Sequence, residues 1–491
     1  MNSLVSLVGR AAALVVWLVP AVATGQVEKG KATGPAPSRE IRELAVSPAE
    51  APVPAFKYLL KPSSARLAPG DGAPILLRLR YDVSDADWAE IEDSTAGWIH
   101  AAIGRPMPPE ASAMVEKRRG SLDLLAVGVR RERCDWAYPI REQGVDVVDL
   151  LMPDVGVMRN WGRLQAVATR ILIDRGDFTG AARSLTTGFA LAERVAEGPF
   201  LINGLVGVAI ADVQLATVEA WIAAPGSPNL YWALTELGEP LVSLDRAVEQ
   251  ERLFIERSIP ELADESEPTT AEGWSARLAA IDRRVRGLAA RIFSDDDAKP
   301  SERDARVKAA LGADLAEYKR MHMDEFRRLL VAAGDFSAER VRAMSDDEAA
   351  VRGAVLAYRV VWEGSFRDWR LEFPAFEARE AQRQAEGIEA ERGPAGLAAL
   401  FASSLASCRV ATARLDRRVA MLRAVEAIRM RAAAREGRLP RALGDVREAP
   451  VPADPMTGEP FGWTMDGEVA TLSPPEPRRF APDYRITIRK P

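Results

Sequence analysis

The chain of 491 residues is poor in the side chains that most catalytic and metal sites use, with two histidines and two cysteines. A zinc site of two or three histidines would need both His100 and His322, which lie far apart in the sequence. A serine or cysteine triad would need one of them as its base. We therefore expect packing or surface roles for both histidines and no histidine-based catalysis.

The two cysteines, Cys134 and Cys408, lack the spacing of a disulfide framework. They could pair in an oxidising compartment. Two separately buried thiols are the simpler interpretation.

An excess of charge of one sign is also lacking, since 65 basic side chains stand against 71 acidic ones. No long run of either sign indicates a nucleic-acid partner or an anionic membrane surface. No phosphate-binding glycine loop, dinucleotide fingerprint, zinc-ligand spacing or Gly-x-Ser-x-Gly elbow occurs in a credible context. The sequence thus predicts no cofactor and no metal.

The beginning of the chain has the pattern of an export signal. Arg10 precedes an apolar run over residues 11–19, Pro20 interrupts it, and Ala21-Val22-Ala23 offers a small-residue cleavage site. We expect residues 1–23 to be removed and the protein to be periplasmic or extracellular, with an uncleaved signal acting as an anchor as the alternative. The run is shorter than the roughly 20 residues of a stable span, so no membrane span is expected after cleavage.

The remaining chain is predicted to be divided into four parts. Residues 24–55 are rich in proline, alanine, glycine and charge, which predicts a disordered linker. A helical domain is expected over 56–260, a second helical region over 261–408, and a helix with a Pro-rich segment and a small β-hairpin over 409–491. The fold class is mainly α, either an irregular helical bundle or a short helical-repeat array.

Two adjacent helices carry the clearest periodicity. Apolar residues recur at helical spacing over 157–171, and a second amphipathic helix spans 178–195 after Gly176. The pair is similar to half of a tetratricopeptide unit, although no second copy follows at a period near 34 residues. Capping-box patterns at Ser84 and Ser345 predict two further helix starts.

The stretch 200–224 is apolar on nearly every side. Such a stretch is typical either of a membrane span or of a buried central helix. An acidic residue at the centre of a span costs roughly 2.5 to 3.5 kcal/mol, so Asp212 and Glu219 favour the buried helix. Gly204 and Gly207 would then permit close helix contacts.

The tail changes character. A helix with one apolar side over 415–428 is expected to end near Gly437, and Asp466-Gly467 has the pattern of a hairpin turn between strands at 463–465 and 469–471. This hairpin is the only β-structure that the sequence predicts downstream of residue 150.

Several sequence segments together resemble those of a group of uncharacterised exported proteins of planctomycete bacteria. They are Tyr58-Leu59-Leu60, Cys134-Asp135-Trp136, the segment 163–198, the run 204–207, and Asn229 to Leu234. The resemblance covers roughly residues 55–260 and implies a helical, tetratricopeptide-like region without implying an activity.

Part of the C-terminal region is similar to a sequence segment in the globular heads of pseudopilins. The likeness lies in Glu436-Gly437-Arg438-Leu439-Pro440 followed by the segment 454–461, Asp-Pro-Met-Thr-Gly-Glu-Pro-Phe. It implies a shared helix-plus-hairpin module and suggests a component of a secretion apparatus.

Asp212 and Glu219 are the candidate catalytic residues. Their seven-residue spacing places both carboxylates on one helical face. Burial of that face would raise both pKa values, and a pair with divergent pKa values could act as general acid and base. The alternative is that arginines of neighbouring helices neutralise them as structural ion pairs.

Two further groups are candidate binding residues. Cys134, Asp135 and Trp136 would place a thiol or carboxylate beside an aromatic wall, with a packed thiol and Trp as the alternative. Trp362, Phe366 and Trp369 form an aromatic stripe that would stack on a sugar or a partner helix, with a core seam as the alternative.

Together these observations predict an exported, non-catalytic helical scaffold that binds a protein or another component of the cell envelope. The alternative is a carboxylate-dependent envelope hydrolase that uses Asp212 and Glu219.

Overall fold

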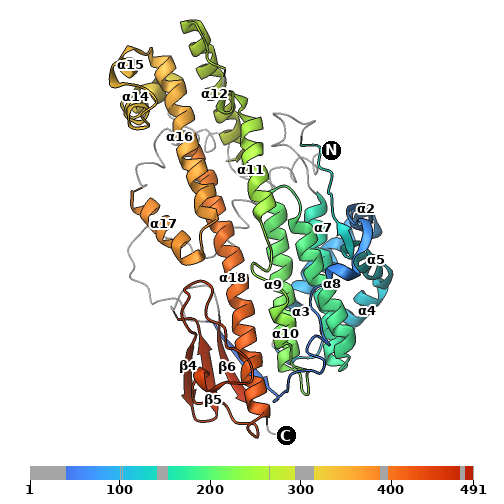
Figure 1. Ribbon diagram of the computed structural model, residues 1–491. Coiled ribbons are helices and arrows are strands. Elements are labelled where there is room, and N and C mark those ends of the chain that lie inside the picture. Colours follow the sequence, from blue (N-terminus) through green and yellow to red (C-terminus); the bar gives the residue numbers. More distant parts are fainter. Residues whose placement is uncertain are drawn as a thin grey trace. The chain divides into compact units, whose positions relative to one another are not determined.

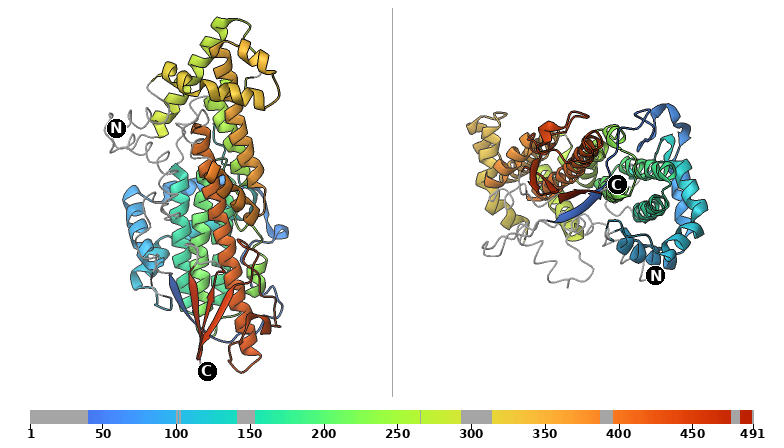
Figure 2. Two further views of the ribbon diagram at one scale, coloured as in Figure 1. Left: turned by 90° about the vertical axis from the view of Figure 1, so that its left-hand side faces the viewer. Right: turned by 90° about the horizontal axis from the view of Figure 1, so that it is seen from below.

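The computed structural model describes residues 40–99, 101, 103–140, 153–264, 266–292, 314–386, 396–475 and 482–489. The described chain is mainly α-helical with a small sheet, which confirms the predicted fold class (Figures 1 and 2). Its contacts divide it into two compact units. We call the unit that includes Val248–Arg409 the helical unit, and the unit of Val27–Ala137, Pro153–Ala247 and Val410–Pro491 the mixed unit.

Three consecutive helices form the centre of the mixed unit. They are α7 (Pro153–Asp174), α8 (Phe178–Ala196) and α9 (Leu201–Ala223), and each packs on the other two (Figure 1). Gly176 takes a φ of 72° in the turn between α7 and α8, a conformation that costs glycine little. The Asp177 side chain then caps α8 by accepting the backbone N–H of Gly180 at 2.8 Å. The predicted helix pair is confirmed at its expected position.

Helix α9 is buried inside the mixed unit. Among the described residues it is the one helix long and apolar enough to cross a membrane, but 78% of its most apolar window is buried within the protein. Gly207 allows this packing, because a Cβ there would lie 2.6 Å from the carbonyl oxygen of Ala192 in α8. A Cβ at Gly204 would collide with the side chain of Leu244. The stretch is thus a core helix, as its acidic residues indicated.

Shorter helices cover α7 and α8. The segment before α7 forms α2 (Ala73–Arg78), α3 (Asp85–Ile99), α4 (Pro109–Lys117) and α5 (Arg119–Val129). Ser84 begins α3, and its hydroxyl accepts the backbone N–H of Asp87 at 3.2 Å. Helix α3 packs on α7 through an edge-to-face contact of Trp88 with Trp161, whose ring centroids are 5.2 Å apart. Two short parallel strands, β2 (Ala68–Asp71) and β3 (Arg131–Arg133), join the two ends of this segment.

The mixed unit also contains a four-stranded sheet in the order β1-β6-β5-β4. The predicted hairpin is confirmed as β4 (Gly462–Asp466) and β5 (Val469–Ser473), with Gly467 at a φ of 60° in the turn. Strand β6 (Asp483–Ile488) pairs antiparallel with β5. The sheet thus extends beyond the hairpin expected from the sequence.

The fourth strand corrects the prediction of a disordered linker over 24–55. Residues Ile41–Val46 form β1, which pairs parallel with β6. Leu44 and Val46 are fully buried. Because Leu44 and Val46 are two positions apart in a strand, both side chains lie on the same face and make it apolar. The composition of residues 24–55 as a whole did not indicate this apolar face. The part of the expected linker before residue 40 lies outside the described residues.

The long helix α18 (Gly396–Ala433) contributes its residues from Val410 onward to the mixed unit. Its apolar side buries Met421, Leu422, Val425 and Ile428 completely. The chain leaves this helix through Gly437, whose φ is 79° and whose N–H donates to the carbonyl of Ala432 at 2.8 Å. The helix end predicted near Gly437 is therefore correct.

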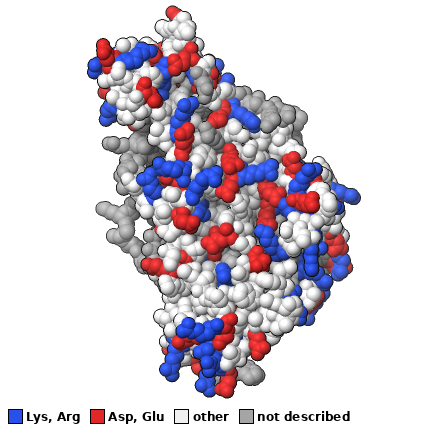
Figure 3. Space-filling view, viewed as in Figure 1, with Lys and Arg blue, Asp and Glu red and all other residues white. Residues whose placement is uncertain are grey.

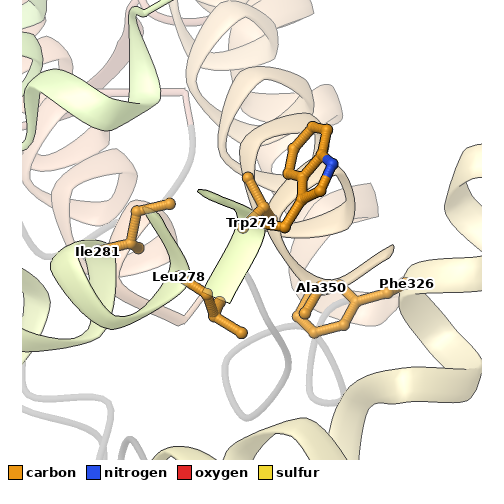
Figure 4. Packing of buried hydrophobic residues seen from close by; sticks show 6 residues of the cluster. Trp274, Leu278, Ile281, Phe326 and Ala350 are labelled. Atoms are coloured by element: carbon orange, nitrogen blue, oxygen red, sulfur yellow. The ribbon is translucent and has the colours of Figure 1, made fainter. Parts of the chain in front are cut away.

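The helical unit is built from amphipathic helices. They are the later part of α11 (Asp245–Ser258), then α12 (Ala271–Ile292), α14 (Leu315–Ala332), α15 (Ala338–Ala343), α16 (Asp346–Trp369) and α17 (Phe373–Glu386). Its core includes Trp274, Leu278, Ile281, Phe326 and Ala350 from α12, α14 and α16 (Figure 4). Ser345 caps α16 as predicted, since its hydroxyl accepts the N–H of Glu348 at 3.2 Å.

The compact units do not follow the linear order that the sequence suggested. The boundary expected after residue 408 falls within one residue of the division at Arg409, and the boundary expected after 260 is found at Ala247. The tail after Val410 belongs to the same unit as the first helical segment. The physical reason is a set of buried ionic contacts that α18 makes inside the mixed unit.

Candidate functional site

The two candidate catalytic carboxylates lie on α9 but in different surroundings. The side chain of Glu219 is 2% exposed, whereas that of Asp212 is 58% exposed. Helical spacing brings them to one side of α9, but only Glu219 reaches the protein interior. The condition under which both carboxylates would act as a buried pair is therefore not met by Asp212.

Glu219 is the centre of a buried cluster of four side chains, which we call the Glu219 cluster: Arg42, Glu219, Arg418 and Tyr484. Arg42 Nη1 lies 2.8 Å from Oε1 and 2.7 Å from Oε2 of Glu219. Arg418 Nε donates to Oε1 at 2.9 Å, and the Tyr484 hydroxyl donates to the same oxygen at 2.5 Å. Because β1, α9, α18 and β6 each supply one member, the cluster ties the sheet to the helices of the mixed unit.

The electrostatics of the Glu219 cluster follow from its burial. Desolvation raises the pKa of Tyr484 far above its usual range, and the charge of Glu219 raises it further, so the hydroxyl stays a hydrogen-bond donor. Burial opposes the charge of Arg418, but Glu219 and Asp212 outweigh it and raise the pKa of Arg418 well above its ordinary value. The guanidinium groups therefore remain charged and neutralise the buried carboxylate.

Arg418 also connects the two candidate residues. Its Nη1 donates to Asp212 Oδ1 at 2.6 Å and to the backbone carbonyl of Asp212 at 3.0 Å. The two carboxylates are thus bound to one guanidinium. This arrangement suits charge neutralisation better than an acid and a base facing a substrate.

Other buried ion pairs lie along the same part of α18. Arg417 donates to Asp454 at 2.9 and 2.7 Å, with both side chains almost fully buried. Arg429 donates to Glu426 at 3.0 and 2.9 Å and also to the carbonyl and hydroxyl of Ser227 at 2.7 and 2.9 Å. These residues are not among the candidates from the sequence, although charged residues on an otherwise apolar helix side are a usable signal for buried pairs.

The segment 454–461 forms a turn around Asp454. Its carboxylate accepts the N–H of Met456 at 3.0 Å and the hydroxyl of Thr457 at 3.3 Å, in addition to the bonds from Arg417. Gly458 continues the turn with a φ of 74°. Residues 454–461 therefore hold the segment before β4 against α18.

The candidate binding residues Cys134, Asp135 and Trp136 form a connecting segment in the mixed unit. Cys134 and Trp136 are buried, and Trp136 Nε1 donates to the carbonyl of Arg194 at 2.8 Å. Asp135 is exposed, and its carboxylate accepts the N–H of Ala137 at 3.1 Å. Burial raises the pKa of the Cys134 thiol far above its usual range, which disfavours a reactive thiolate. The contacts are those of a packed segment docked on α8.

The second candidate binding group belongs to the helical unit. Trp362 is 1% exposed and Trp369 is 9% exposed, while Phe366 is half-buried. The rings of Trp362 and Phe366 meet edge to face with centroids 5.0 Å apart. Arg409 stacks at 5.9 Å from the ring of Trp369. The stripe is therefore a core seam of α16, with little surface left for a ligand.

His322 and Cys408 occupy packing positions. His322 is buried in α14 beside Tyr318, with ring centroids 4.8 Å apart, and His100 lies outside the described residues. Cys408, like Cys134, is a buried free thiol. Within the described ranges no three His, Cys, Asp or Glu side chains gather as metal ligands.

The function is inferred from the geometry of the site. No family model, curated protein or solved structure matches this chain. On the face in Figure 3, basic and acidic side chains are interspersed. The surroundings of Glu219 are accordingly the most specific guide to what the candidate site does.

Proposed function

We propose that the chain is an exported, non-catalytic helical protein that binds a protein or another component of the cell envelope. The non-catalytic part of this proposal is supported by the burial of Glu219 and by its contacts with Arg42, Arg418 and Tyr484. The side chain of Glu219 is 2% exposed and both of its oxygens contact Arg42, with Arg418 and Tyr484 bonded to Oε1. The export signal pattern over residues 1–23 supports the location.

The alternative function, a carboxylate-dependent envelope hydrolase, needs two carboxylates that both reach a substrate. Glu219 has little room to do so, and Asp212 shares the guanidinium of Arg418 with it. A hydrolase would also require both carboxylates to face a substrate, whereas both are bound to the guanidinium group of Arg418. This geometry argues against hydrolysis by the pair.

Exposed apolar side chains are one kind of surface that a macromolecular partner can bind. The side chain of Val53 is 90% exposed and that of Phe56 is 51% exposed, three positions apart in the segment after β1. Large apolar side chains that remain in water are candidates for partner contacts when they occur close together. We therefore take the Val53–Phe56 segment as the surface to test first.

Fractionation and capture test the two parts of this proposal separately. The tagged chain is expressed in its native host, and the amino terminus of the recovered protein is read by mass spectrometry. Removal of residues 1–23 and recovery outside the cytoplasm are expected. A cytoplasmic protein with an intact amino terminus would refute export.

The binding part is tested by crosslinking and capture from the native envelope. The wild type is expected to retain one envelope component at near-stoichiometric amount, and the double variant Val53→Asp/Phe56→Ser to lose it. Tyr81→Ser is the matched control, because Tyr81 is also 83% exposed but lies elsewhere in the chain. Release of soluble glycan fragments from isolated envelope by the wild type, and not by Asp212→Asn, would favour the hydrolase instead.

A further inference from the structure

A cavity of about 340 Å³ in the mixed unit lies apart from the Glu219 cluster. Its lining combines side chains of both charges with an apolar part: Lys61, Glu193, Ala196, Glu197, Pro240, Leu241, Ser243 and Arg246. Ser243 and Arg246 are exposed, so the cavity opens to solvent on their side. Its volume is within the usual range of small-molecule sites.

The negative charges of the cavity come from the last turn of α8. Glu193 and Glu197 are four positions apart, which places them one above the other on the helix. The carbonyl end of a helix carries a partial negative charge, so acidic side chains there are disfavoured. Burial raises the pKa of Glu197, although Arg194 opposes this shift. Glu193 already pairs with Lys61, and Glu197 with Arg194. Because a carboxylate accepts several hydrogen bonds, an ammonium group of a ligand would bind here as a further donor to these two carboxylates.

The positive charges lie on other segments. Arg246 is in the first turn of α11, where the partial positive charge of the helix end disfavours a cation. Lys61 comes from the segment before α2 and pairs with Glu193 at 2.5 Å. An anion beside Arg246 would benefit from both the guanidinium and the amino end of α11.

The four charges restrict what fits the cavity. A simple anion would face Glu193 and Glu197, and a simple cation would face Lys61 and Arg246. A ligand with both charges avoids each repulsion. We propose that this cavity binds a small zwitterion of the amino-acid type, with its ammonium group toward Glu193 and Glu197, its carboxylate toward Arg246, and its side chain against Ala196, Pro240 and Leu241.

Blocked derivatives of one amino acid test this inference. Binding to the purified chain is measured by saturation-transfer NMR and calorimetry for L-leucine, glycine, L-lysine and L-glutamate. The amide of L-leucine lacks the carboxylate charge, and N-acetyl-L-leucine lacks the ammonium charge. We expect L-leucine to bind at least tenfold more tightly than either derivative.

Variants assign the binding to this cavity. Arg246→Gln is expected to weaken L-leucine at least tenfold and to leave the leucine amide unchanged, whereas Glu193→Gln is expected to weaken both. Arg183→Gln is the matched control, because Arg183 is an exposed residue of α8 outside the cavity lining. Circular dichroism melting of each variant establishes that it is folded.

Two results would overturn the inference: absence of binding by all four amino acids, or equal binding of L-leucine and its blocked derivatives. An unchanged affinity in folded Arg246→Gln would place any binding elsewhere. The inference rests neither on export nor on a macromolecular partner. Its failure would leave the proposed function standing, and the reverse also holds.

Discussion

The hydroxyl of Tyr484 donates a hydrogen bond of 2.5 Å to Oε1 of Glu219, although the two residues are 265 positions apart in the chain. This contact joins β6, the last strand in sequence order, to α9, a buried helix of the mixed unit. Arg42 of β1 and Arg418 of α18 complete the same cluster. A side chain that the sequence offers as a catalytic acid is thus surrounded by residues that hold the unit together.

Replacement of Glu219 by Gln is expected to lower the free energy of unfolding by about 3 to 5 kcal/mol, because it leaves two guanidinium groups without their buried counter-charge. Urea unfolding followed by circular dichroism measures this loss. Asp212→Asn is the control, and we expect it to cost less than about 1 kcal/mol, since the Asp212 side chain is 58% exposed and Arg418 keeps its contact with Glu219. Equal losses in both variants would contradict the assignment.

Gly188→Ala is expected to destabilise the mixed unit by about 1 to 3 kcal/mol. A Cβ at Gly188 would lie 2.9 Å from Cγ of Gln214 and closer still to its amide, while that amide donates to the carbonyl of Gly162 at 3.0 Å. Gly156→Ala in α7 is the matched control, since nothing lies within 4 Å of its Cβ. There the alanine should stabilise the helix by up to about 1 kcal/mol. Thermal melting of both variants compares them, and a Gly188→Ala protein as stable as the control would show that the close contact is absent.

Leu44→Ala is expected to cost about 2 to 5 kcal/mol of stability, because the Leu44 side chain is fully buried in β1. Glu43→Ala, at the neighbouring exposed position, should change stability by less than about 0.5 kcal/mol. Chemical denaturation provides the measurement. Indistinguishable midpoints for the two variants would mean that residues 41–46 do not form a strand of the sheet.

The stability of the helical unit is expected to fall as the pH drops below about 6.5, in part through His322. Burial lowers the pKa of His322, and Glu325 opposes this only partly. The unfolded chain then takes up a proton that the folded chain resists, so acidification favours unfolding. His322→Phe should show a smaller loss of stability than the wild type between pH 7.5 and 5.5. Parallel pH dependences of the two proteins would exclude this role.

The sequence was most informative where local periodicity decides the structure. The helices α7 and α8, their turn at Gly176 and the hairpin at Gly467 follow from spacing and turn chemistry within a few residues. Strand β1 was missed because six residues among prolines and alanines show no signal until their partner β6 is known. Pairing between distant segments depends on the tertiary fold.

The same distinction applies to the candidate site. The spacing of Asp212 and Glu219 predicts their position on one side of one helix, and the many arginines of the chain make their neutralisation a ready alternative. The identity of Arg42 and Tyr484 as partners is not predicted by the sequence, because they come from strands at opposite ends of the chain. The aromatic stripe of α16 likewise could not be assigned to core or surface until its packing was known.

The parallel pairing of β1 with β6 has a consequence for how this polypeptide acquires its shape. An early segment must wait for one of the last segments to be synthesised before it can enter the sheet. Contacts of such long sequence separation slow folding. Until β6 is present, the apolar side chains of Leu44 and Val46 stay exposed to water. A nascent chain released before its final strand would therefore be a target for chaperones and proteases.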